Sequence, residues 1–148
     1  MRKRTKAREY ALQVLYQLDI RHGEIAGILQ EFWEAHQPTP EVKAFAQQLA
    51  EGTMAHVQEI DQLIGAHANN WDMKRMAVVD RNILRLGVFE LRHVHDVPPT
   101  VSINEAIELA KRFGDAESAK FINGILDAIH KASARKATPE DSPAAANP

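Results

Sequence analysis

Five cationic side chains stand at the start of the sequence, before its first acidic residue. They are Arg2, Lys3, Arg4, Lys6 and Arg8. Cations at the N-terminal end of a helix oppose the helix dipole, which favours acids there, so helix stability does not explain this run. We interpret it as a binding site for a polyanion such as RNA, because each phosphate that a cation neutralises releases condensed counterions. The alternative is a solvated helix end without a partner.

The charge of the whole chain favours a local grip over a broad basic face. The formal net charge is −2 and residues 1–8 carry +5, so the other 140 residues carry −7. Such a chain repels polyanions everywhere except at its basic tip. At about 100° per residue, Arg4 and Arg8 share one flank of an apolar helical stripe, and Lys6 lies on the other flank beside Tyr10. The cations are therefore expected to surround one end of a helix.

The sequence offers few groups for catalysis or metal binding. His93 and His95 are two residues apart, about 200° on a helix, so these two imidazoles do not converge on one metal ion. Glu105 and Glu108 are expected on a solvated face as ordinary surface charges. There is no cysteine, and the seven glycines form no phosphate-binding loop. We predict no enzymatic activity, no metal site and no cofactor.

Length and hydropathy place the chain in a broad class. Its 148 residues suit one domain or two small lobes, and 45% of them are hydrophobic. No stretch approaches the roughly 18 apolar residues of a membrane span. The basic start is not followed by an apolar signal core with a cleavage site. We expect a cytoplasmic protein that does not interact with membranes.

Apolar residues recur with helical period throughout, and no segment alternates as a strand does, which predicts an all-α fold. Thr39 and Pro40 suit the start of a helix, and Gly114 suits an end. Gly52 lies inside a helix, where it would allow close approach of a neighbour. The segment 67–72 is the expected seam between lobes. The expected helices span about 3–20, 24–36, 40–66, 73–94, 102–113 and 115–131.

Three side chains do not fit the stripes of their helices. Tyr16 lies about 160° from the centre of its stripe, which indicates either a second packing surface or a partner site. Phe121 lies about 90° off its inward face beside Lys120, which suits either base stacking or packing on a neighbouring helix. Asp80 would lie within an apolar face, where a lone carboxylate is costly. We favour a helix break that Asp80 caps, with a donor on a partner chain as the alternative.

Three segments carry a resemblance to a known family. The run "VSINEAIELAKRFG", followed by "SAKFINGILDAI", closely resembles the C-terminal signature of the NusB family of bacterial transcription antitermination factors. "RTKAREYALQVLYQLD" and "VDRNILRLGVFEL" resemble its N-terminal and central helices. The resemblance covers residues 1–131 and implies six to seven helices in two small packed bundles, about 1–70 and 71–131. Residues 132–148 are small, polar and Pro-rich, and we expect them to be disordered.

The resemblance also implies a function without catalysis. NusB-like proteins pair with NusE, a small-subunit ribosomal protein, and the pair binds the boxA element of ribosomal RNA leader transcripts. Further Nus factors then join RNA polymerase, which resists termination. The implied partner contacts are Tyr16 and Asp80. The implied RNA contacts are the basic run, where Thr5 replaces a frequent arginine, together with Phe113, Glu117, Lys120 and Phe121.

Two other functions fit the same sequence. A helical protein-binding adaptor would leave the basic tip without a role. An RNA-binding domain like that of certain ribosomal RNA cytosine methyltransferases would continue into a cofactor domain, whereas this chain is expected to end in a tail. Because some family members self-associate, we also expect that the free chain can form a homodimer.

Overall fold

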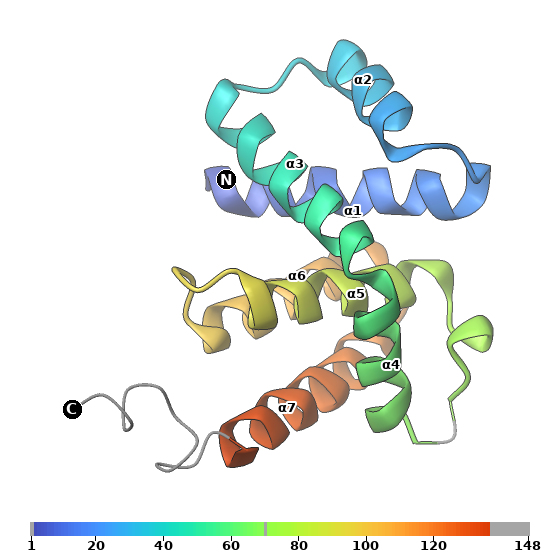
Figure 1. Cartoon of the computed structure of the whole chain (residues 1–148), viewed down its shortest axis with the longest axis vertical. Coiled ribbons are helices and arrows are strands. Elements are labelled where there is room, and N and C mark those ends of the chain that lie inside the picture. Colours follow the sequence, from blue (N-terminus) through green and yellow to red (C-terminus); the bar gives the residue numbers. More distant parts are fainter. Residues whose placement is uncertain (1, 70, 137–148) are drawn as a thin grey trace.

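The computed structural model describes residues 2–69 and 71–136, and within these ranges it contains seven α-helices and no strand. The all-α prediction is confirmed. Figure 1 shows the helices, with a short 3-10 turn at Met73–Arg75 between α4 and α5. The α-helices are α1 (Lys3–Arg21), α2 (Ile25–His36), α3 (Pro40–Ala55), α4 (Val57–His67), α5 (Val78–His93), α6 (Pro99–Phe113) and α7 (Ser118–Lys136).

Helix α5 is the centre of the fold. It contacts α1 and α3 on one side and α4, α6 and α7 on the other, and α1 crosses α3 above it in Figure 1. Its side chains Ile83, Leu84, Leu86 and Val88 are almost fully buried, as its apolar circumference predicted. The division into lobes near residue 70 stays a prediction. No helix in the described ranges has the length and hydrophobicity needed to cross a membrane.

The expectation of one long helix over 40–66 is wrong, because the helix breaks at His56. The backbone there departs from helical geometry (φ −113°, ψ 18°), and its N–H donates back to the carbonyls of Gly52 and Thr53. The change of direction lets α3 pack against α1 while α4 packs against α5 and α7. The apolar stripe continues through the break, so periodicity alone did not reveal it.

Other helix ends also differ from the expectation. The segment 73–94 divides into the 3-10 turn and α5, as favoured, but Ala77 occupies the cap position, and Asp80 lies in the first turn, where the dipole favours it. Helix α6 begins at Pro99, since a proline at the first helical position needs no N–H partner. Helix α7 includes residues 132–136, where a disordered tail was expected; the rest of the expected tail, residues 137–148, lies outside the described ranges.

Charged side chains connect α1, α4 and α5. Arg81 Nη2 donates to Asp19 Oδ2 at 2.7 Å, and Arg85 binds Asp61 with two hydrogen bonds of 2.8 and 2.9 Å. Burial alone would raise the pKa of Asp19, but the hydrogen bonds from Arg81 and Asn82 outweigh it and lower the pKa. The ionised carboxylate therefore stabilises the fold at neutral pH, and this contribution is lost as the pH falls through the lowered pKa.

The close approach predicted at Gly52 is present. A Cβ atom there would lie 2.1 Å from Phe89 Cζ. We expect Gly52→Ala to lower the free energy of unfolding, because overpacking costs about 1–3 kcal/mol. The higher helix propensity of alanine offsets roughly 1 kcal/mol of this cost. The matched control is Gly65→Ala in α4, where nothing lies within 4 Å of the added atom. Urea unfolding should show loss in the first variant only, and equal stability of the two would contradict the close contact.

Candidate nucleic-acid interface

Four of the five predicted cations lie at least partly exposed around the start of α1. They are Arg2, Lys3, Arg4 and Lys6. Lys3 Nζ lies 3.0 Å from Glu41, and Arg4 Nη2 lies 3.0 Å from Asp96, with both pairs open to solvent. Exposed ion pairs contribute little to stability, so these cations can exchange their carboxylates for phosphates. Lys3 and Arg4 reach different parts of the fold, one toward α3 and the other toward the segment between α5 and α6.

Arg8 does not share that surface, which corrects the expectation from the sequence. Its side chain is 3% exposed, and its guanidinium binds Glu90 through two hydrogen bonds of 2.7 and 2.9 Å. A third bond of 2.9 Å reaches Glu105, which therefore leaves the solvated face where we had placed it. Burial alone would lower the pKa of Arg8, but Glu90 and Glu105 outweigh it and raise it. Arg8 stays charged and joins α1 to α5 and α6.

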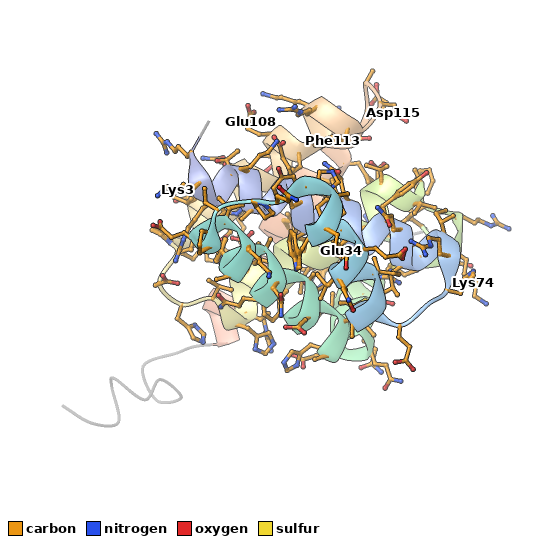
Figure 2. The ribbon with its side chains drawn as sticks, turned by 90° about the horizontal axis from the view of Figure 1, so that it is seen from above. Lys3, Glu34, Lys74, Glu108, Phe113 and Asp115 are labelled. Atoms are coloured by element: carbon orange, nitrogen blue, oxygen red, sulfur yellow. The ribbon has the colours of Figure 1, made fainter. Side chains whose placement is uncertain are left out.

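A further cation, Arg112, was not predicted from the sequence, and it extends the basic end of α1 toward α6. Arg112 Nη1 lies 2.9 Å from Glu9, and Lys6 Nζ lies 3.9 Å from the other oxygen of the same carboxylate. The Arg112 guanidinium also lies 5.4 Å from the ring of Phe113. Figure 2 shows Phe113 and Asp115 at the end of α6. Lys6, Arg112 and Phe113 therefore form a continuous surface; the signal in the sequence was the position of Arg112 directly before Phe113.

The turn after α6 sets the start of α7. Asp115 N–H donates to Ser118 Oγ at 3.0 Å, and Glu117 N–H donates to Asp115 Oδ1 at 2.9 Å. These bonds close the turn and fix the register of the first helical residues. Glu117 and Lys120 are exposed as a result, while Phe121 is half-buried.

A groove of about 850 Å³ opens beside Lys120 and Phe121. Trp71, from the segment between α4 and α5, lies edge-on to Phe121 with ring centroids 5.6 Å apart, and it is 56% exposed. Phe121 packs on the core, which was one of the two alternatives, and it also lines the groove. Base stacking by Phe121, the other alternative, stays a prediction. Aromatic faces beside cations suit stacking of single-stranded bases. Trp71 was not predicted, because its segment shows no helical periodicity of apolar residues from which the place of its side chain could be inferred.

Asp80 lines the same groove from the first turn of α5. Its side chain is 9% exposed, and among the described residues its buried Oδ1 atom has no hydrogen-bond partner. An unpaired buried acceptor is costly, so this carboxylate is suited to receive a donor from a bound molecule.

An apolar patch on α1 lies beyond the basic end. Tyr16 is 42% exposed and Ile20 is 52% exposed, and their spacing of four residues places them on one face of the helix. The structure thus leaves Tyr16 open and not covered by a second packing surface of the fold. Ile20 was missed by the sequence reasoning, although its spacing from Tyr16 was the available signal.

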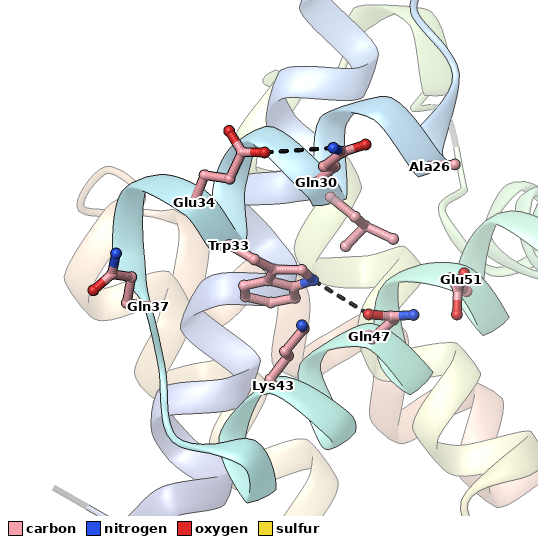
Figure 3. A pocket seen from close by; sticks show the side chains of 9 residues that line it. Ala26, Gln30, Trp33, Glu34, Gln37, Lys43, Gln47 and Glu51 are labelled. Carbon is pink, nitrogen blue, oxygen red and sulfur yellow. Dashed lines mark hydrogen bonds between the residues drawn. The ribbon is translucent and has the colours of Figure 1, made fainter.

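A separate hollow of about 490 Å³ lies between α2 and α3 (Figure 3). Trp33 Nε1 donates to Gln47 Oε1 at 3.2 Å, and Gln30 donates to Glu34 at 3.4 Å. None of the predicted site residues lines this hollow, so we assign it no part in the surface described above.

The sequence model of the NusB family matches residues 5–131. A transcription antitermination protein NusB of Myxococcus xanthus (strain DK1622) is 47% identical over 133 residues, which cover 87% of this chain and 95% of the relative. A second, from Thermodesulfovibrio yellowstonii, is 42% identical over 139 residues, which cover 87% and 92%.

Two solved structures share the fold. A structure of T. maritima NusB is similar with a TM-score of 0.81 and 38% identity, covering 86% of this chain and 90% of that one. Another, described as antitermination factors NusB and NusE in complex with dsRNA, is similar with a TM-score of 0.82 and 34% identity, covering 89% and 98%. This chain belongs to the NusB family.

Proposed function

We propose that this chain is a cytoplasmic transcription antitermination factor that binds boxA RNA of ribosomal RNA leader transcripts together with NusE. In this role it supports the assembly of further Nus factors on RNA polymerase. The observation that carries the proposal is the surface that Lys6, Arg112 and Phe113 form at the basic end of α1, with the turn between α6 and α7 following Phe113. The similar solved complex of NusB, NusE and RNA supports it.

The surface offers separate contacts for the backbone and the bases of a strand. Cations at the start of α1 and at Lys120 would hold phosphates, and the rings of Phe121 and Trp71 would stack on unpaired bases. Glu117 and Asp80 would accept hydrogen bonds from base amino groups or from the protein partner. Stacking requires exposed base faces, so we propose a single strand as the preferred ligand, with duplex RNA as the comparison.

A matched pair of lysines on α7 tests the groove. Lys120 and Lys131 are both exposed, but Lys120 lines the groove, whereas Lys131 lies further along the helix and pairs with Asp127 at 2.9 Å. Lys120→Gln should weaken boxA RNA binding about fivefold and reduce the salt slope by about 0.7, as expected for one lost phosphate contact. Lys131→Gln should change neither. Equal effects of the two variants in a salt series would remove the groove from the interface.

The exposed pair on α1 is proposed to contact NusE. Truncating Tyr16 and Ile20 together to alanine should weaken NusE binding about tenfold or more, since exposed aromatic anchors dominate many interfaces. Val101→Ala is the control, because Val101 is also 42% exposed but lies on α6. Titration calorimetry with NusE should separate the variants while RNA binding by the chain alone stays unchanged. Loss of RNA binding instead would show that the pair contacts RNA.

A helical protein-binding adaptor is the second candidate, favoured by the same exposed pair, Tyr16 and Ile20. An adaptor would bind NusE as tightly as the wild-type antitermination factor would, but it would have no affinity for RNA.

Homodimer formation by the free chain is also proposed to use the exposed patch of Tyr16 and Ile20. Sedimentation at rising concentration would then show association of the wild type and a monomer for the double alanine variant.

A further inference from the structure

Three potential metal ligands meet near the C-terminal end of α5, whereas Asp80 lies in its first turn. His56 comes from the break between α3 and α4, Glu59 from α4 and His93 from the last turn of α5. His56 Nδ1 lies 3.7 Å from one oxygen of Glu59, and His93 Nε2 lies 3.9 Å from the other. One ligand atom from each residue lies within 4.8 Å of the other two. From the sequence, His95 was the histidine weighed as a partner of His93, and that pair was not expected to converge on a metal ion. The fold instead brings His56 to His93.

The imidazole of His93 has an unused nitrogen in this cluster. Its Nε2 atom is buried and, among the described residues, has no hydrogen-bond partner. His36 and His67 differ, because each ring bonds a carbonyl of its own helix at 3.0 Å. A buried nitrogen without a partner is unusual, and a bound cation would satisfy it.

The rings of His56 and His93 already lie side by side. The ring of His93 stacks on that of His56 with centroids 4.0 Å apart and on that of Phe89 at 5.3 Å. The planes of the two imidazoles are 20° apart, so one ring must turn before a nitrogen of each can face the same ion. Arg92 Nη2 lies 3.8 Å from Glu59, and its positive charge opposes a metal ion there.

We propose that His56, Glu59 and His93 bind one zinc ion, with water completing the coordination. Two imidazoles and a carboxylate are ligands that zinc accepts. Tetrahedral zinc at about 2.1 Å from each ligand needs ligand atoms roughly 3.4 Å apart. Atoms that now lie up to 4.8 Å apart must therefore approach by as much as about 1.4 Å. The side chains of His56 and Glu59, 41% and 47% exposed, are the ones that can turn toward the more enclosed His93. The ion would fasten the α3–α4 break to the end of α5, independently of any RNA binding.

Zinc chloride titrated into the untagged full chain, by calorimetry and by thermal unfolding, tests this site. We expect one ion per chain and a melting temperature that rises with zinc concentration, because a ligand of the folded state stabilises it. His56→Gln and His93→Gln should each weaken binding about tenfold or more. His67→Gln is the control and should bind zinc as the wild type does.

Cobalt provides a second measurement that does not depend on stability. Co²⁺ bound by this ligand set should give visible absorption in the wild type and in His67→Gln, and lose it in His56→Gln and His93→Gln. Circular dichroism of each variant confirms that it is folded. The proposal is overturned if the wild type binds no zinc, or if both the His56 and the His93 variants retain wild-type affinity.

Discussion

Arg8→Ala lowers the free energy of unfolding by about 3–5 kcal/mol, the effect expected when one member of a buried ion pair is removed. The substitution leaves Glu90, which is also 3% exposed, without its two guanidinium hydrogen bonds. Ser102 remains as a neutral donor to Glu90 at 3.0 Å and does not replace the lost charge. Urea unfolding of the variant and the wild type measures the difference.

Arg4→Ala is the matched control for this effect, since Arg4 lies one helical turn before Arg8. Its ion pair with Asp96 has side chains 48% and 67% exposed. Removing such a pair should cost less than about 1 kcal/mol. If the two alanine variants unfold at the same urea concentration, the Arg8 network does not stabilise the fold as described.

Replacing Lys3, Arg4 and Lys6 together by glutamine is expected to weaken RNA binding about a hundredfold at low salt. Each lost phosphate contact on a single strand reduces the slope of log affinity against log salt by about 0.7, so the slope should fall by about 2. Arg8 is left in place because its burial makes it part of the fold. The measurement is fluorescence anisotropy of labelled RNA across a salt series.

The control for the triple variant changes the net charge equally at other exposed positions. Arg21, Lys43 and Lys131 are exposed on α1, α3 and α7 and are replaced by glutamine together. A general electrostatic attraction would weaken to the same degree in both triple variants. If the RNA-binding site lies at the start of α1, the control variant should keep nearly the RNA affinity and salt slope of the wild type.

Local sequence signals predicted much of the fold because they act within one helix. The period of apolar residues located α1 and α2 to within a residue or two at each end. It could not reveal the break at His56, because the reason for the break is the different packing of α3 and α4. Arg8 is a similar case: its partners Glu90 and Glu105 are 82 and 97 positions away, so only the folded chain shows its burial.

The candidate site was predictable where its residues belong to periodic helices. Lys120 and Phe121 stood out by their angle from the apolar face of α7. Trp71 belongs to a connecting segment without period, and the fold brings it to Phe121. The proximity of His56 and His93 was equally unpredictable, because they lie on separate elements and neither position carries a local signal of the other.

The most direct test of the central claim is the anisotropy of a short boxA RNA titrated with the full chain, with and without NusE. A scrambled strand and a boxA duplex serve as comparisons. The account predicts that the boxA strand is preferred over both, and that NusE tightens its binding further. Equal affinity for the boxA and scrambled strands in both conditions would contradict it.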